Sequence, residues 1–224
     1  MPRIHFQQQL VELKEKLLAM AALSQQALET AVEAYLTRDV ELCAHVLELE
    51  HGINAAERQV DEMAYELLAK EQPMAIDLRF ILSIIKINGD LERVGDQSSS
   101  ISERAIAMLD VAAVELPVDI RRMGEHAGRM VRLAIQALLD ADARLAESVL
   151  QMDDEIDAMN QSVHESLVSL MQKRPELTPQ ALNAIIISRN LERAADHATN
   201  IAEDVIFWVR GSDVRHKMSL ALAD

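Results

Sequence analysis

Apolar residues recur at alternating spacings of three and four along most of the chain, a pattern typical of helices that pack side by side. Prolines stand between the apolar stretches, where a missing backbone N–H costs little helix stability. The pattern predicts six long helices, with Gly211 as the stop signal of the last one. We place them at residues 4–36, 40–71, 76–109, 118–139, 142–173 and 178–210.

The chain also repeats itself. Residues 91–103 read LERVGDQSSSISE, and about 100 positions later residues 191–203 read LERAADHATNIAE. The repeat extends backwards, with VLELEHGIN matching VLQMDDEID at a shift of 103. Short turns between three helices force an up-down-up order in each unit. We therefore predict an all-α fold of two tandem, pseudo-symmetric three-helix bundles, with repeats at 1–110 and 117–212 and a C-terminal tail at 213–224.

Charge and composition exclude several classes of function. The net charge of −15 argues against nucleic acid and anionic lipid as ligands, since both require a basic surface. No apolar run approaches the roughly 18 residues of a membrane span, and the first residues do not resemble a signal peptide. We expect a cytoplasmic protein that meets membranes only through partner proteins.

The sequence offers no catalytic apparatus. It has no nucleophile constellation, no glycine-rich phosphate loop and no cluster of Cys and His, so we do not expect an enzyme. The single cysteine, Cys43, is expected in the core. His51, His126 and His164 are expected on helix surfaces.

The first half of the third predicted helix is apolar on all sides. Leu78, Leu82 and Ile85 lie away from the stripe that faces the core of the bundle. A helix of this kind is buried on two sides, within its own bundle and against a second surface. We expect the other repeat to cover this side, or else a partner protein.

Two pairs of carboxylates stand out because both repeats carry them. Glu92 and Asp96 are four residues apart, which places them on one helix face with a rise of ~6 Å between them. Glu192 and Asp196 occupy the equivalent positions. Acidic pairs at this spacing are common by chance in so acidic a chain. Their equivalence in the two repeats indicates more than a solvated surface.

The preceding helix turns back near Pro73 or Pro175, and residues equidistant from a turn lie at one level. Acidic or amide side chains of that helix therefore lie opposite each carboxylate pair. Unscreened like charges so close together destabilise a fold, so a positive group belongs among them. A metal cation and an arginine, Arg93 or Arg193, both satisfy this requirement, and both interpretations stay open. The candidate metal ligands are the carboxylates and one amide gathered across the two helix pairs: Glu50, Asn54, Glu92, Asp96, Asp153, Asp157, Glu192 and Asp196.

The donor atoms of these candidates are all oxygens. Such sites suit Mg²⁺, Mn²⁺ or iron, whereas copper and structural zinc favour Cys and His. Asn54 stands where the second repeat has Asp157. We therefore expect the N-terminal site to bind metal more weakly.

The doubled motif resembles the Leu-Glu-Arg-Ile-Gly-Asp signature of the PhoU family. KEQPMAIDLR at 70–79 and FWVRGSDVRHK at 207–217 fit the same family. The resemblance implies a commonly dimeric protein whose acidic motifs hold metal ions or clusters, and it carries those motifs onto the eight candidates above. Asn54 and the pair Ala194-Ala195 depart from the pattern. Four further side chains are expected to support the ligands from outside: Arg93, Arg193, His197 and Asn200.

Family resemblance also implies a function, that of a negative regulator of the phosphate-starvation response. Such a protein would be an adaptor linking the ATPase subunit of a phosphate ABC transporter to a sensor histidine kinase. Two alternatives keep the fold: an accessory regulator of a low-affinity phosphate permease, and a metal-free helical scaffold. A di-iron enzyme would need Glu-x-x-His on two helices, and the acidic stretches offer only Glu48 with His51.

Overall fold

The computed structural model describes residues 2–212, and within this range it contains helices and no strands. The predicted tail at 213–224 lies outside the described residues. The helices are α1 (Pro2–Thr37), α2 (Val40–Glu71), α3 (Ile76–Ala107), α4 (Ile120–Asp140), α5 (Ala143–Leu150), α6 (Asp153–Lys173) and α7 (Thr178–Arg210), with a short 3₁₀ turn, Pro175–Leu177, before α7.

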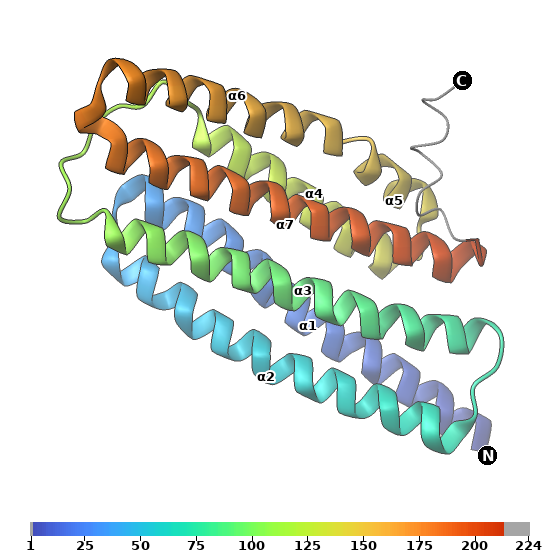
Figure 1. Ribbon diagram of the computed structural model, residues 1–224. Helices are drawn as coiled ribbons and strands as arrows, with labels where there is room; N and C mark the ends of the chain where they lie inside the picture. The colour runs from blue at the N-terminus through green and yellow to red at the C-terminus, as the bar shows by residue number, and fades with distance from the viewer. Residues whose placement is uncertain (1, 213–224) are drawn as a thin grey trace, which may run out of the picture.

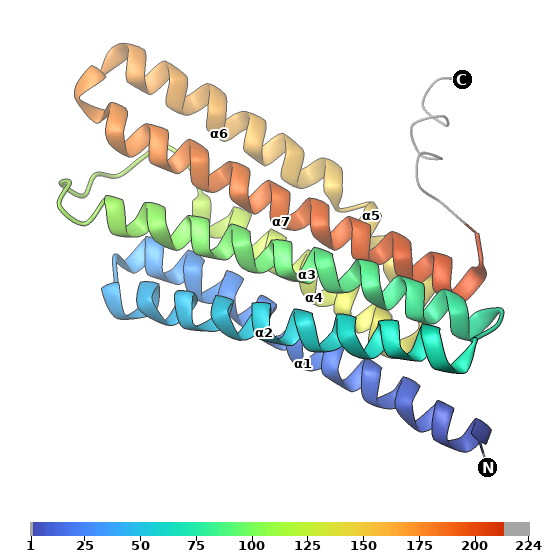
Figure 2. The same ribbon diagram turned by 60° about the horizontal axis from the view of Figure 1, so that its bottom comes forward.

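The helices form two bundles that lie side by side (Figure 1). The first bundle contains α1, α2 and α3, and the second contains α4, the pair α5 and α6, and α7. Between the bundles α3 packs against α7, as the view in Figure 2 also shows, and α1 packs against α4. The predicted all-α fold of two three-helix bundles is confirmed.

The duplication extends to the turns. Arg38 and Ala141 both adopt left-handed backbone conformations, with φ of 58° and 53°, at the ends of the first helix of each repeat. The next residue, Asp39 or Asp142, accepts hydrogen bonds from two backbone N–H groups of the following helix. An N-cap of this kind is worth ~1 kcal/mol. Gly211, with φ of 71°, ends α7 as predicted.

The predicted helix at 142–173 is interrupted, so the expectation of one continuous helix is wrong. α5 ends at Leu150 and α6 begins at Asp153, and the N–H of Met152 donates to the carbonyl of Val149 in a tight turn. Three acidic residues, 153–155, occupy the first turn of α6. The positive end of the helix dipole stabilises carboxylates there, whereas in a continuous helix they would lie mid-helix without that support.

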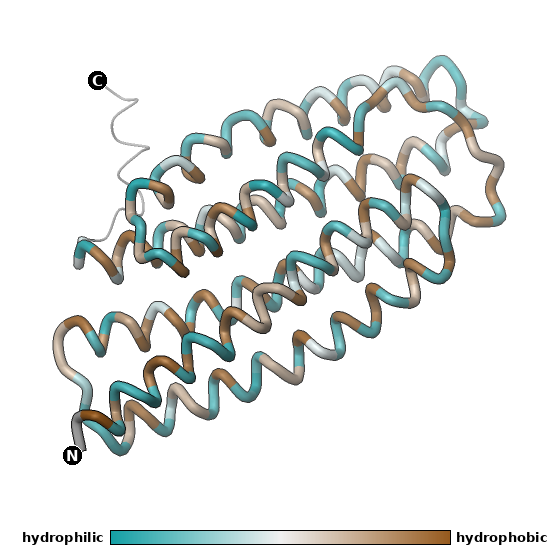
Figure 3. The backbone as a smooth tube through the Cα atoms, turned by 180° about the vertical axis from the view of Figure 1, so that it is seen from behind, coloured by the Kyte–Doolittle hydropathy of each residue, from teal (hydrophilic) through white to brown (hydrophobic). Residues whose placement is uncertain are grey.

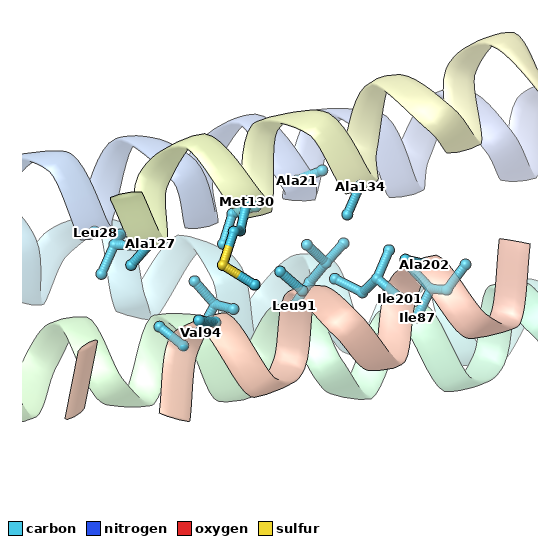
Figure 4. Close-up of a cluster of buried hydrophobic side chains, with 14 of the residues drawn as sticks. Ala21, Leu28, Ile87, Leu91, Val94, Ala127, Met130, Ala134, Ile201 and Ala202 are labelled. Carbon is cyan, nitrogen blue, oxygen red and sulfur yellow. The ribbon is translucent and has the colours of Figure 1, made fainter. Parts of the chain in front are cut away.

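Both bundles share one hydrophobic core. Apolar and polar residues alternate along each helix (Figure 3), and the apolar ones meet at the centre of the molecule. Leu91 and Val94 from α3, Met130 from α4 and Ile201 from α7 belong to one cluster of buried side chains (Figure 4). This cluster draws on both repeats, and beside it the described residues contain a small separate cluster of Ala34, Cys43 and Ala105 in the first bundle. Cys43 is fully buried, as predicted.

The apolar side of α3 is less covered than expected. Leu78 and Leu82 keep 36% and 39% of their surface exposed, so the other repeat does not bury them. The reason is the face that α3 turns toward α7. The rings of Phe80 and Trp208 pack in a tilted arrangement with centroids 4.9 Å apart, and Ser83 Oγ donates to the carbonyl of Asp204 at 3.0 Å.

The contact between α1 and α4 generates a stability prediction. A Cβ at Gly124 would lie 2.7 and 2.8 Å from the two γ-methyl groups of Val32, which is too close for either to retain its place. We expect Gly124→Ala to lower the free energy of unfolding by about 1–3 kcal/mol in urea titrations. Val32→Ala in the same chain should restore part of the loss.

Gly128 is the matched control for this prediction. It is also buried on α4, but a Cβ there would approach only Glu29 Cγ, at 3.9 Å. Gly128→Ala should be neutral or stabilise the protein by up to about 1 kcal/mol, because Gly is a poor helix former. Equal effects of the two substitutions would refute the close packing of α1 on α4.

Candidate metal centres

The first cluster of carboxylates lies between α2 and α3, where the sequence places it. Asn54 Nδ2 donates to Glu50 Oε1 at 2.5 Å on α2. On α3, Arg93 lies 3.2 Å from Asp96 Oδ2 and 3.5 Å from Glu92 Oε2. Burial and the neighbouring Asp96 raise the pKa of Glu92, with smaller contributions from Glu57 and Glu50 across the helix pair, and Arg93 opposes them. The predicted residues are therefore brought together, and their charge is partly compensated.

The second cluster lies between α6 and α7. Burial, followed by the negative charges of Asp157 and Asp196, raises the pKa of Asp153 to about 6. Burial, followed by Glu192 and Asp157, raises the pKa of Asp196 to about 6 as well. Burial and Asp157 also raise the pKa of Glu192. All four predicted carboxylates therefore interact, across two helices.

Compensation of charge distinguishes the two clusters. Arg193, the counterpart of Arg93, lowers the pKa of Glu192 and of Asp196 but forms no ion pair with either one among the described residues. In addition, Asp153 Oδ1 is buried and has no hydrogen-bond partner within residues 2–212. The second cluster thus carries more uncompensated negative charge.

The chemistry of the second cluster fits a metal ion better than its geometry does. The donors are oxygens, their charges repel one another, and one buried carboxylate oxygen has no hydrogen-bond partner within residues 2–212, which together suit a hard cation at the second cluster. The side chains do not converge on a point, since no three His, Cys, Asp or Glu residues at 2–212 are arranged to hold a metal ion. Closing either cluster around an ion requires side chains to rotate toward it.

Two residues expected to support the ligands contact the other bundle. His197 Nδ1 and Asn200 Nδ2 are 2.9 and 3.2 Å from Asp90 Oδ1 of α3. Nearby, Lys86 Nζ lies 3.1 Å from Oδ1 of the largely buried Asp204. Sequence analysis missed Asp90 and these partners, because the pairs are more than 100 positions apart and only the packing of α3 on α7 joins them.

Gly95 explains one of the differences between the repeats. A Cβ at this position would lie 2.9 Å from Cδ1 of Ile53 on α2, so the glycine permits a close approach of α2 and α3 beside the first cluster. The second repeat has Ala195 at the equivalent position, and it is fully buried. The departure from the motif changes helix packing and removes no candidate ligand.

Comparison with known proteins now decides the family. The model of the PhoU domain matches the chain twice, at residues 17–105 and 120–205. The chain belongs to the PhoU family. No helix within residues 2–212 is both long enough and apolar enough to cross a membrane.

Named relatives cover most of the chain. It is 41% identical over 214 residues to the phosphate-specific transport system accessory protein PhoU homolog of Pseudomonas aeruginosa, covering 94% of this chain and 88% of that protein. Identity to the Escherichia coli protein of the PhoU family, also named a phosphate-specific transport system accessory protein, is 28%, covering 94% and 88%.

Solved structures of PhoU proteins have the same architecture. The crystal structure of PhoU from Pseudomonas aeruginosa superposes with a TM-score of 0.89 at 39% identity, covering 92% of this chain and 100% of that one. The phosphate transport system regulatory protein PhoU from Streptococcus pneumoniae gives 0.86 at 27% identity, covering 93% and 99%. These likenesses confirm the predicted family and fold.

Repulsion in the second cluster predicts a pH dependence of stability. The folded chain binds protons at Asp153 and Asp196 more tightly than the unfolded chain, because folding raises both pKa values from a usual 3.8 to about 6. Stability should therefore fall as pH rises from about 4 to about 6. Asp153→Asn with Asp196→Asn should flatten this part of the profile and raise the urea midpoint at pH 7 in EDTA.

Glu165→Gln serves as the control, since it removes one exposed charge from α6 outside the cluster. It should leave the slope between pH 4 and 6 unchanged. A double variant with the wild-type slope would contradict the repulsion between α6 and α7.

Proposed function

We propose that this protein is an accessory regulator of a phosphate transport system and a negative regulator of the phosphate-starvation response. The observation that carries the proposal is the 41% identity, over 94% of the chain, to a protein named as an accessory of phosphate-specific transport. Similarity to a protein named as a phosphate transport regulatory protein, with a TM-score of 0.86, supports it.

The regulator acts by binding, as a cytoplasmic adaptor and homodimer. It links the ATPase subunit of a phosphate ABC transporter to a sensor histidine kinase, so that abundant phosphate keeps the kinase response off. Long acidic helices, with a chain net charge of −15, offer docking faces for such partners. Membrane proximity comes through the transporter.

Metal ions at the two carboxylate clusters are part of this proposal. Magnesium, manganese or iron would neutralise the repulsion between the carboxylates and tie the two helices of each cluster together. Asp153 and Asp157 on α6 with Glu192 and Asp196 on α7 would hold the tighter ion. Their charge is the less compensated, and Asp157 supplies a carboxylate where the first cluster has Asn54.

Regulation is tested by the alkaline phosphatase output of cells in phosphate-rich medium. Deletion of the gene should switch the output on, and the wild-type gene should restore repression. The isosteric quadruple variant Glu92→Gln, Asp96→Asn, Glu192→Gln and Asp196→Asn should fail to repress, because it removes the charge that binds metal from α3 and α7.

A matched quadruple variant controls for the change in net charge. Glu12, Glu62, Glu125 and Glu165 are exposed and lie outside both clusters, and their change to Gln should leave repression intact. Low output in the deletion strain would refute the regulatory function. Full repression by the cluster variant would refute a signalling role for the carboxylates.

The order of metal affinity is tested by calorimetric titration with Mn²⁺. Asp157→Asn should weaken the tighter site by about tenfold or more, since fewer charged ligands lower the affinity for hard cations. Asn54→Asp, the reciprocal change, should strengthen the weaker site. The assignment would be reversed if the affinity of the tighter site changed in Asn54→Asp and stayed at the wild-type value in Asp157→Asn.

A further inference from the structure

The second repeat contains a polar contact at the break between α5 and α6. His126 on α4, expected at the surface, keeps only 11% of its side chain exposed, so that expectation is wrong. Its Nε2 lies 3.1 Å from the carbonyl oxygen of Met152, the residue before α6. A carbonyl can only accept, so Nε2 carries the proton and donates.

The same turn is held at a second point. Arg122 Nη2 lies 3.2 Å from Glu155 Oε1. Arg122 and His126 both come from α4, one helical turn apart. The start of α6 is therefore fastened to α4 through one backbone carbonyl and one carboxylate.

The first repeat serves as an internal comparison, because residues here correspond at a shift of 103. Leu23 stands at the position of His126, and Gly52 stands at the position of Glu155. A Cβ at Gly52 would lie 3.5 Å from Cδ1 of Leu23, so this contact is apolar. In that repeat α2 runs without interruption from Val40 to Glu71. The polar contact and the helix break occur together, in the same repeat.

The break lies next to the second carboxylate cluster. Met152 directly precedes Asp153, and Asp157 follows one turn later on α6. Where α6 begins, and how it is rotated, thus determines how both carboxylates face Glu192 and Asp196. We propose that His126 is a positioning residue that holds the start of α6 so that Asp153 and Asp157 face α7. This inference rests on the proposed metal binding at that cluster.

The test uses the full-length protein and Mn²⁺. His126→Leu, which copies the first repeat, should weaken binding at the second cluster by about tenfold or more, the usual cost of losing an outer partner of a metal site. His126→Gln keeps an N–H donor for the Met152 carbonyl and should restore most of the affinity. The weaker site, between α2 and α3, should not change.

His164→Leu is the control, because it removes an exposed histidine from α6 itself and should leave both affinities unchanged. Urea titration of each variant separates loss of fold from loss of metal binding. Wild-type affinity in folded His126→Leu would overturn the proposal, and so would equal losses in the Leu and Gln variants.

A second readout separates this inference from the proposed function. If the wild-type protein binds no Mn²⁺, the metal-binding part of the proposed function fails, while hydrogen exchange still reports on the start of α6. Amide exchange at residues 152–156 should then be faster in His126→Leu than in wild type, and close to wild type in His126→Gln. Unchanged exchange in His126→Leu would overturn the positioning role.

Discussion

Packing of α3 against α7 is the contact on which the rest of the molecule depends. These two helices carry the repeated motifs, and their buried faces join both bundles into one hydrophobic core. Close packing of this kind allows little independent movement. Each carboxylate pair is therefore held on a rigid central helix, and its companions come from the more peripheral α2 or α6. The geometry of each cluster depends on how its outer helix is attached.

The two repeats differ in how far the negative charge of their carboxylate clusters is compensated. In the first, Arg93 pairs with both carboxylates of α3, and Asn54 replaces an acid. In the second, all four positions are Asp or Glu, and burial with mutual repulsion raises the pKa of Asp153 and Asp196 to about 6. The helix break adds a dipole that favours negative charge at the start of α6. Duplication preserved the positions, whereas the chemistry diverged.

Periodicity and the internal repeat were sufficient to predict the helices apart from the break between α5 and α6, the two bundles and the residues of both clusters, because these depend on local patterns and on distance from a turn. Other features depend on packing that no local pattern contains. The pairing of His197 with Asp90 requires knowledge of the contact between α3 and α7. The burial of His126 could be predicted only with knowledge of the helix break at Gln151 and Met152. No Gly or Pro at these positions indicates that a helix ends there. Exposure of Leu82 follows from the face that α3 offers to α7.

Retention of the second cluster is itself informative. Four interacting carboxylates, one with a buried oxygen that lacks a hydrogen-bond partner among the described residues, weaken a fold that its shared core would otherwise stabilise further. An amide at Asp153 or Asp196 would relieve the repulsion with almost no change of shape, and Asn54 shows that the first repeat has accepted such a change. Local rules of stability are typically broken where function requires it. A cation bound by these carboxylates, as we propose, would account for both the repulsion and its retention, because the ion would convert a destabilising cluster into a link between α6 and α7.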